Sequence, residues 1–304
     1  MSSKVAAVVA DDCLFLGVPM TLIYPNIVPE NNLRLPDALT VKHGPAPLLS
    51  RFVLEGDKAA RQIGIRLRLR HDFAELAYIN KQQVTNQTWF PLVKMYDPKY
   101  CELTSENSYW ISGEDERGEI VLTQAGRIHY WPNTNLKEEV RLMLYGGRDE
   151  GQLCSVTAPA AKLITGVVFC AGAHWIRPDF RGFRLSHLLA RLGRACAVAR
   201  WPVDWCVAIV APALVDKGVA DGYGYKHASY SIFFPGAPSG AFENVLTYLS
   251  ADEAYADFEK FLIEMLSASE EDRLAPMPGL GRPLDDKVTR ISSDGVFHGS
   301  SSRS

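Results

Sequence analysis

The sequence predicts an α+β fold in which several helices flank a single sheet. Residues 62–69 alternate apolar and polar side chains, as a half-buried strand does, and residues 71–87 then place apolar side chains at three- and four-residue steps, as a helix does. Residues 108–131 contain strand-like segments around a glycine-bounded acidic connection, which is the pattern of a hairpin. A long apolar run at 163–176 leads into an amphipathic helix at 185–199.

The composition is that of an ordinary globular protein with enough residues for a substantial core. The chain has 304 residues, of which 47% are hydrophobic and 22% are charged, values typical of soluble domains. Lysines and arginines number 32 against 35 aspartates and glutamates, so the net charge is −3. A protein held to nucleic acid by phosphate contacts needs a broad basic surface. We therefore expect no nucleic-acid partner.

The cysteines and the start of the chain indicate a cytoplasmic protein. The six cysteines are scattered without a C-x-x-C pair, and we expect them to be reduced: Cys13, Cys101, Cys154, Cys170, Cys196 and Cys206. The apolar run before Asp11 is too short for a secretory signal, and no run of roughly 18 apolar residues is present. We expect a soluble protein without a membrane partner. The scattered histidines show no metal-ligand spacing, so no metal is expected.

The residues before the first predicted strand are rich in proline, which favours short extended pieces and turns over long helices. These prolines are Pro25, Pro29, Pro36, Pro45 and Pro47. We expect residues 1–61 to form an N-terminal extension that packs on the core.

The middle of the chain is predicted to form antiparallel strands. Three segments have the composition or alternation of strands: Ser108–Ser112, Glu119–Thr123 and Ala125–Trp131. The interval 113–118 is the expected hairpin connection. A short helix is predicted at Leu136–Tyr145, followed by a glycine-rich loop at 146–151.

The second half of the chain is organised around a central strand predicted at Leu163–Ile176. The helix at Leu185–Ala199 has an apolar stripe that leaves Arg191, Arg194 and Arg200 outside it. The remaining predicted elements are a strand at 205–210, a helix at 212–220, a strand at 227–234 and a helix at 251–266. Residues 269–304 are polar and rich in Pro, Gly and Ser, and are expected to form a disordered tail.

The turn Arg177–Ser186 joins the central strand to the amphipathic helix and has the features of an anion site. First-turn N–H groups of a helix lack intrahelical partners, and the helix dipole is positive at that end. Arg177, Arg181 and Arg184 add positive charge. The turn therefore predicts a site for phosphate or pyrophosphate. A solvated basic loop that caps a helix has the same pattern.

This turn resembles the acyl-CoA-binding motif of the GNAT acyltransferases, which commonly reads Arg or Gln, two residues, Gly, one residue, then Gly or Ala. The residues that carry the resemblance are Ile176, Pro178, Asp179-Phe180, Arg181-Gly182 and Leu185-Ser186. The order of predicted elements over 62–235 is also similar, and Tyr223-Gly224-Tyr225 stands where the family often has Leu-Gly-Phe.

The resemblance implies an α/β/α-layered fold with a mixed, mostly antiparallel sheet that splays into a V at its centre. The GNAT-like acyltransferase core would span 62–235, followed by a C-terminal helical extension at 236–268. Acetyl-CoA, or another acyl-CoA, would be the co-substrate.

The resemblance also assigns cofactor-binding positions. Arg181 would occupy the first motif position, and the ends of the central strand at Trp175 and Ile176 would hydrogen-bond the pantetheine arm. The N–H groups that would cradle the pyrophosphate are those of Gly182, Phe183, Arg184, Leu185 and Ser186. Arg184 and Ser186 replace the glycines usual in the family. A missing glycine removes close backbone approach, so Arg184 either supplies an ion pair to a phosphate in exchange or weakens the site.

The catalytic candidates are His174 and Tyr223. The chemistry that the resemblance implies is direct attack of an amine on the thioester, which needs a base, an oxyanion donor and alignment. His174 has a suitable resting pKa for that base. Many family members protonate the departing thiolate with a tyrosine, but Ala220 stands there in this chain, and Tyr223 or Tyr225 would supply the hydroxyl instead. A satisfied buried histidine and packing tyrosines fit the same positions.

Three functions remain open from the sequence. The leading one is an acyl-CoA-dependent N-acyltransferase, with acetyl as the expected group and a small-molecule or protein amine as acceptor; oligomerisation is left open. The second is an N-acyl amino acid or acyl-homoserine-lactone-like synthase with longer acyl donors, because residues 126–134 are similar to that family's arginine-then-Pro-x-Thr segment. An aromatic stripe suits a long chain: Trp89, Phe90, Tyr96, Tyr100, Tyr109 and Trp110. The third is a degenerate, non-catalytic binding module, because the motif glycines and the helix tyrosine are missing.

Overall fold

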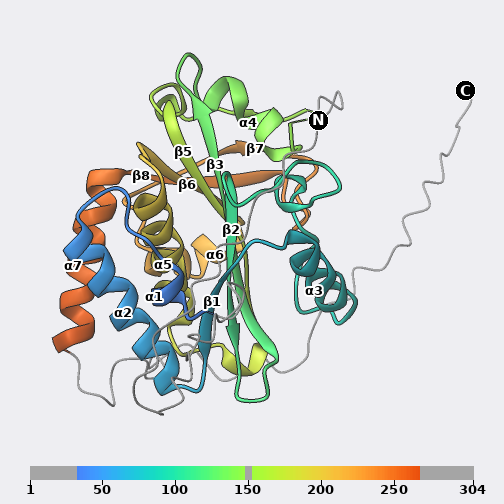
Figure 1. Cartoon of the computed structure of the whole chain (residues 1–304). Coiled ribbons are helices and arrows are strands. Elements are labelled where there is room, and N and C mark those ends of the chain that lie inside the picture. Colours follow the sequence, from blue (N-terminus) through green and yellow to red (C-terminus); the bar gives the residue numbers. More distant parts are fainter. Residues whose placement is uncertain (1–32, 148–152, 268–304) are drawn as a thin grey trace, which may run out of the picture.

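The computed structural model describes residues 33–147 and 153–267. The tail predicted at 269–304 and the first 32 residues of the predicted N-terminal extension lie outside this range. Within it, the chain forms one sheet with helices on both faces (Figure 1).

The sheet has eight strands in the order β1-β2-β3-β5-β6-β8-β7-β4. Their bounds are β1 Arg66–Arg70, β2 Ser108–Glu114, β3 Ile120–Trp131, β4 Ser155–Val156, β5 Gly166–Ile176, β6 Trp205–Val210, β7 His227–Phe233 and β8 Glu243–Ser250. β5 and β6 run parallel, and the other neighbouring pairs among the described strands are antiparallel. The mixed, mostly antiparallel sheet predicted from the sequence is confirmed.

The parallel pair is where the sheet opens. Pairing joins Val168–Ala171 of β5 to Trp205–Ala208 of β6 and then stops. β5 nevertheless continues to Ile176 and β6 to Val210. Beyond Ala171, the edge of β5 that faces β6 therefore has no strand partner, as the expected V-shaped splay requires.

Helices cover both faces of the sheet and make the layered arrangement. Their bounds are α1 Leu35–Ala38, α2 Ala46–Gln62, α3 Phe73–Thr85, α4 Leu136–Leu144, α5 Leu185–Arg200, α6 Pro212–Asp216 and α7 Ala251–Ser267, with short 3-10 turns η2 Lys94–Tyr96, η3 Pro159–Lys162, η4 Pro178–Phe180 and η5 Ala220–Tyr223. α2, α5 and α7 pack together on one face, and α3 and α4 lie on the other (Figure 1). Each face has its own core, with Leu192 of α5 in one and Leu76 of α3 in the other.

Helix α2 corrects the prediction of short extended pieces in the proline-rich N-terminal region. Pro45 is the N-cap and Pro47 lies in the first turn, where a missing N–H costs no intrahelical hydrogen bond. The helix buries Phe52 against Phe258 of α7, with ring centroids 5.1 Å apart. A Cβ at Gly56 would lie 2.9 Å from Cδ2 of Leu192. Glycine therefore lets α2 approach α5 closely.

Strand β8 lies between β6 and β7, although no strand was predicted at 243–250. Its polar residues hide the apolar alternation, because two of them are buried within the sheet. Thr247 is 3% exposed, and its Oγ1 donates to the carbonyl oxygen of Ala208 at 3.1 Å. The sheet thus extends into residues for which only a helical extension was expected.

Two smaller differences concern element bounds. The two strands predicted at 119–123 and 125–131 are one strand, β3, whose register with β5 shifts between Thr123 and Ala125. The helix predicted at 212–220 ends at Asp216 and is followed by the 3-10 turn η5. The other predicted helices and strands lie within a few residues of their observed bounds.

Arg191 and Arg194 are buried, which overturns the prediction that they lie outside the apolar stripe of α5. Arg194 is 0% exposed and Arg191 8%. Both pair with Asp257 of α7: Nε and Nη2 of Arg191 donate to its two carboxylate oxygens at 3.0 Å, and Nη2 of Arg194 donates to Oδ2 at 3.0 Å. The guanidinium groups also lie over the rings of Phe261 and Tyr225, at 4.2 and 4.4 Å from the centroids. The carboxylate and the two aromatic faces offset part of the desolvation cost of burying these cations.

We predict that Asp257→Asn destabilises the protein strongly, because the substitution leaves two buried guanidinium groups without a counterion. Removing one partner of a buried ion pair typically costs about 3–5 kcal/mol. Urea denaturation followed by circular dichroism measures the change. Glu259→Gln, at an exposed position of the same helix, is the matched control and should change stability by less than about 0.5 kcal/mol. Equal effects of the two substitutions would show that the buried network contributes nothing.

Candidate functional site

The end of β5 carries a β-bulge. Gly172 lies opposite Ala125 and Trp175 opposite Thr123, so β5 has one more residue than β3 between these pairs. Ala173 has a φ of +49°, a left-handed conformation that is costly for a residue other than glycine. The Oγ1 of Thr123 donates to the carbonyl oxygen of Ala173 at 3.0 Å and supports the bulge. Bulges next to a sheet opening redirect side chains.

The predicted cofactor residues Trp175 and Ile176 follow the bulge, and both are buried. The Trp175 ring stacks on Trp89 at 5.5 Å between centroids, and its Nε1 donates to the carbonyl oxygen of Thr88 at 3.2 Å. The carbonyl oxygen of Ile176 accepts from Nε of Arg181 at 3.0 Å. The strand end is therefore tied both to the loop after α3 and to the turn before α5.

Arg177 does not supply a free positive charge, contrary to the sequence-based expectation. Its Nε donates to Asp179 at 2.8 Å, its Nη1 to Glu119 at 2.9 Å and its Nη2 to Asp115 at 3.1 Å. The hydrogen bond from Arg177 lowers the pKa of Asp179. Three carboxylates thus neutralise this guanidinium, whose role is to hold the β2–β3 connection against the turn.

Arg181 differs from Arg177, because its hydrogen bonds go to backbone carbonyls. Besides the bond to Ile176, Nη2 donates to Thr88 at 3.3 Å. No carboxylate among the described residues forms an ion pair with it. Burial lowers the pKa of Arg181, the direction expected for a cation without a counterion. Arg181 therefore contributes an uncompensated positive charge to the turn.

The backbone N–H groups of residues 182–186 have no hydrogen-bond acceptor within the described part of the chain. Gly182 and Arg184 have φ values of +94° and +55°, so the turn curls through left-handed conformations before α5 begins. Arg184 is the N-cap of α5 and makes no side-chain cap. Successive unpaired N–H groups at a helix start form a concave donor surface where the dipole favours an anion.

The side chains of the predicted cradle are arranged to leave its backbone accessible. Gly182 is exposed, and no atom lies within 4 Å of the position a Cβ would take. Phe183 is partly buried against the α5-side core, Leu185 is 3% exposed and Ser186 is half-buried. The Nε of Arg184 is buried without a hydrogen-bond partner. Arg181 and the exposed backbone of residues 182–186 thus lie together in the turn before α5.

His174 and Tyr223, the predicted catalytic pair, lie together on the α5 side of the sheet, with ring centroids 5.7 Å apart. Nδ1 of His174 donates to Oε1 of Gln124 at 3.2 Å, and its Nε2 is buried without a partner. Burial, with a smaller contribution from His187, lowers the pKa of His174 to about 4. Burial raises the pKa of Tyr223 to about 12. At neutral pH both side chains are therefore uncharged.

Two further residues of this cluster were not predicted. His187 lies in the first turn of α5, is 8% exposed, and packs so closely on Gly222 that a Cβ there would overlap its ring. Burial lowers the pKa of His187 to about 4. Gln124 comes from β3 and is 3% exposed. The position of His187 directly after the motif turn was the available signal, but scattered histidines in a sequence do not show which ones meet in space.

Tyr225, the alternative source of a hydroxyl, belongs to the buried arginine network. Arg194 lies over its ring, and burial raises the pKa of its hydroxyl. Nη1 of Arg191 donates to the carbonyl oxygen of Gly222 at 2.6 Å, and Nη2 of Arg194 to that of Tyr223 at 2.8 Å. The network therefore fixes the backbone that presents Tyr223 to His174.

The described residues form no metal-ligand cluster, no membrane-crossing helix and no disulfide. No group of three or more His, Cys, Asp or Glu side chains there is arranged to hold a metal ion. None of the helices described is both long and apolar enough to cross a membrane. The five described cysteines form no disulfide, and burial raises the pKa of Cys170, Cys196 and Cys206 to about 12. These thiols are inert packing groups.

No protein-family model and no curated protein matches the chain. Solved structures are similar to it over most of their own length. A variant of the spermidine N-acetyltransferase SpeG from Vibrio cholerae is 10% identical, with a TM-score of 0.38 and an alignment that covers 62% of this chain and 95% of that one. The aminoglycoside acetyltransferase AAC(6')-Ib in complex with coenzyme A and kanamycin is 16% identical, with a TM-score of 0.36 and coverages of 64% and 98%.

A third similar structure is a GNAT superfamily phosphinothricin acetyltransferase from Sinorhizobium meliloti in complex with acetyl-CoA. It is 13% identical, with a TM-score of 0.33, and the alignment covers 60% of this chain and 88% of that one.

Proposed function

We propose that the protein is an acyl-CoA-dependent N-acyltransferase, with acetyl-CoA as the donor. The observation that carries the proposal is the row of unpaired N–H groups at residues 182–186 beside the uncompensated Arg181. Such a row at a helix start binds phosphate groups, and an arginine adds charge-assisted hydrogen bonds. A pyrophosphate, with adjacent phosphoryl groups, matches several donors in sequence better than a single carboxylate does.

The free edge of β5 supports binding of the rest of the cofactor. Residues 172–176 pair with β3 on one edge only, because pairing with β6 ends at Ala171. An extended pantetheine arm carries two amides and can add to this edge as another strand would. The arm would then run from the turn at 182–186 toward the bulge at Ala173, where the thioester would lie.

The proposed reaction is a direct transfer. The amine nitrogen of the acceptor attacks the thioester carbonyl carbon, the carbonyl oxygen takes up negative charge, and the carbon–sulfur bond then breaks to release CoA as thiolate. Nε2 of His174 would accept the proton that the attacking nitrogen loses, because the ring is neutral and this nitrogen has no hydrogen-bond partner. The hydroxyl of Tyr223 would protonate the thiolate. These residues are the proposed catalytic groups.

The first test is cofactor binding by the wild-type protein and by Arg181→Ala. Wild-type protein at a CoA concentration 100 times its dissociation constant should be stabilised by about 2.7 kcal/mol, measured as a thermal shift. Arg181→Ala removes one charge-assisted contact, typically worth about 1.5–3 kcal/mol, so its affinity should fall roughly 10- to 100-fold. Arg117→Ala, on the exposed β2–β3 connection, is the matched control and should leave affinity unchanged.

The same measurement separates the donors and the alternatives. Acetyl-CoA, octanoyl-CoA and free CoA are compared in parallel, and preference for the long chain would replace acetyl with a longer acyl group. Binding without turnover of any amine would indicate a binding module. No shift with any of the three ligands would refute the proposal.

Arg184→Gly tests whether Arg184 contacts a phosphate. The backbone at this position is left-handed, with φ of +55° and ψ of 13°, and glycine adopts it without the steric cost of a Cβ. The variant should therefore keep or slightly raise the melting temperature. Loss of the cation should weaken CoA binding about tenfold, the effect of about 1.4 kcal/mol. Unchanged or tighter binding would mean that the side chain does not contribute.

The stability of the protein should fall as the pH falls from about 6.5 to about 4, because His174 and His187 bind protons more readily when the chain is unfolded. Both histidines have a folded pKa of about 4, so their contribution is present above about 6.5 and lost as pH drops toward 4. His174→Asn should flatten this dependence partly, since His187 remains. Urea denaturation at several pH values measures it, with exposed His43→Asn as control. An unchanged slope in His174→Asn would show that His174 is not desolvated.

A further inference from the structure

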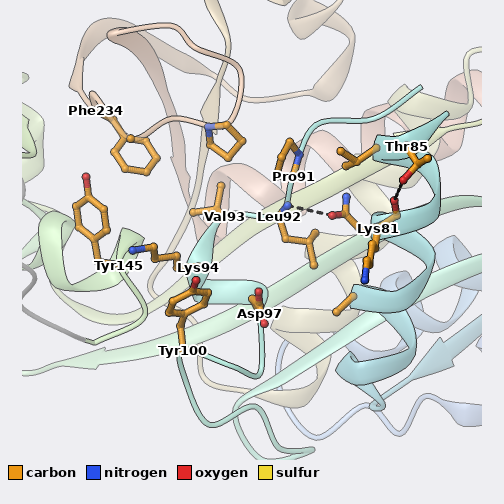
Figure 2. Close-up of a pocket in the computed structure, with 15 residues that line it drawn as sticks. Lys81, Thr85, Pro91, Leu92, Val93, Lys94, Asp97, Tyr100, Tyr145 and Phe234 are labelled. Carbon is orange, nitrogen blue, oxygen red and sulfur yellow. Dashed lines mark hydrogen bonds between the residues drawn. The ribbon is translucent and has the colours of Figure 1, made fainter. Parts of the chain in front are cut away.

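The sheet separates a pocket on one face from the proposed catalytic groups on the other. The pocket, of about 660 Å³, lies on the α3 side, between the C-terminal half of α3, residues 91–100 and the connection that follows β7 (Figure 2). None of the proposed catalytic or cofactor-binding residues lines it. His174 and Tyr223 lie on the opposite face, beside α5. The chemistry of His174 is therefore decided by its neighbours on the α5 side.

Gln124 is the residue of β3 that faces the β-bulge. The register of β3 with β5 shifts between Thr123 and Ala125, so Gln124 alone stands across from Ala173 and His174. A bulge redirects the side chains that it carries, and here the ring of His174 meets the amide of Gln124. Nδ1 of His174 and Oε1 of Gln124 are 3.2 Å apart. Gln124 is only 3% exposed, so bulk water hardly competes for this contact.

This hydrogen bond determines which ring nitrogen of His174 carries the proton. A neutral imidazole has one N–H and one lone pair, and an amide oxygen can only accept. With Oε1 of Gln124 facing Nδ1, the proton lies on Nδ1 and the lone pair on Nε2. The opposite orientation of the amide would place the proton on Nε2, which is buried without a partner. A buried N–H without an acceptor is costly and rare, so the first arrangement is favoured.

Gly193 of α5 makes room for the Gln124 amide. A Cβ at this position would lie 2.5 Å from Nε2 of Gln124 and 3.0 Å from its Cδ. Glycine inside a helix is less favourable than alanine, and here the amide occupies the space that the missing Cβ leaves. The hydroxyl of Tyr109 donates to the carbonyl oxygen of Gly193 and holds α5 against the sheet at this point. The amide is therefore confined between β3 and α5.

The groups around His174 hold its ring without a counterion. They are Gln124 from β3, His187 from α5 and Tyr223 from η5, whose ring centroid is 5.7 Å from that of His174. Burial and the neighbouring His187 lower the pKa of His174 to about 4. A carboxylate in place of the Gln124 amide would oppose this shift, because it would stabilise the charged ring. With an amide there, the ring is neutral at neutral pH.

We propose that Gln124 is a positioning residue for His174: its amide oxygen holds the ring proton on Nδ1 and thereby leaves the lone pair of Nε2 free to accept a proton. The bulge directs the ring, and Gly193 lets the amide reach Nδ1. The tautomer does not depend on what the protein catalyses. That Nε2 takes its proton from an amine rests on the proposed function.

The test is ¹⁵N NMR of the full-length protein, labelled at histidine, at neutral pH and without a ligand. The chemical shifts of the two ring nitrogens of a neutral histidine show which one carries the proton. The signals that are missing from His174→Asn identify those of His174. The proton should lie predominantly on Nδ1. A proton predominantly on Nε2, or an equal mixture of the two tautomers, overturns the proposal.

Two substitutions of Gln124 test its part. Gln124→Met keeps the length of the side chain but removes the acceptor, so the ratio of the Nδ1–H to the Nε2–H tautomer should fall about three- to tenfold, the effect of losing one hydrogen bond. Gln124→Glu keeps an acceptor oxygen and should retain the wild-type tautomer, with the pKa of His174 above its wild-type value. Gln82→Met, at an exposed position of α3, is the matched control. An unchanged ratio in Gln124→Met, or a changed one in Gln124→Glu, contradicts the assignment.

Gly193→Ala tests the position of the amide without altering Gln124 itself. The added methyl group requires the amide to move, so the tautomer ratio should fall as it does in Gln124→Met. When the two substitutions are combined, Gly193→Ala should have no further effect on the ratio, because both act through the same hydrogen bond. An additive effect would overturn the part assigned to Gly193.

CoA binding separates this proposal from the proposed function. The thermal shift with CoA should be the same in wild-type protein and in Gln124→Met, because Gln124 lies on β3 and not in the turn at 182–186. Loss of both the tautomer and CoA binding would mean that Gln124 supports the whole site, and would overturn a specific role. The Nδ1–H tautomer in a protein that binds no CoA retains the positioning and refutes the acyltransferase. CoA binding by a protein with the Nε2–H tautomer retains the acyltransferase and refutes the role of Gln124.

Discussion

Hydrogen bonding between the two parallel strands at the centre of the sheet ends at Ala171 and Ala208, and the candidate site depends on this limit. Beyond this point β5 pairs only with β3, so its last residues have one free edge. They also carry the bulge at Ala173 and lead directly into the turn before α5. A fully paired β5 would have its polar backbone groups satisfied within the sheet. The early end of the β5–β6 pairing therefore leaves a free strand edge beside the unpaired N–H groups of residues 182–186.

Much of the central fold was predictable, because its signals are local. The apolar run that forms β5, the stripe of α5 and the glycine-bearing turn between them are each visible within about one element's length. The form of the sheet was expected from the resemblance to the GNAT acyltransferases. Strand β8 and helix α2 were missed for opposite reasons. In β8, buried polar residues such as Thr247 interrupt the apolar alternation by which a strand is predicted. In α2, Pro45 and Pro47 were interpreted as helix breakers, although they stand at the start of the helix.

The candidate site was predicted only in part, because partner identity is not local. Arg177 and Arg181 lie in the same turn, and the sequence does not distinguish their roles. The fold places three carboxylates beside Arg177, whereas Arg181 donates to backbone carbonyls. In the same way, nothing in the sequence of α5 shows that Arg194 faces the core, since its counterion lies on α7. His187 and Gln124 join His174 through contacts between separate elements.

The pairing of α5 with Asp257 also makes the buried face of α5 dependent on a residue much later in the chain. The two arginines precede their counterion by 66 and 63 residues. A ribosome that has released α5 but not yet α7 exposes a helix whose inner face holds two cations without an anion, and burying these would cost several kcal/mol. Burial of Arg191 and Arg194 with a counterion therefore requires α7, which lies at the end of the described chain.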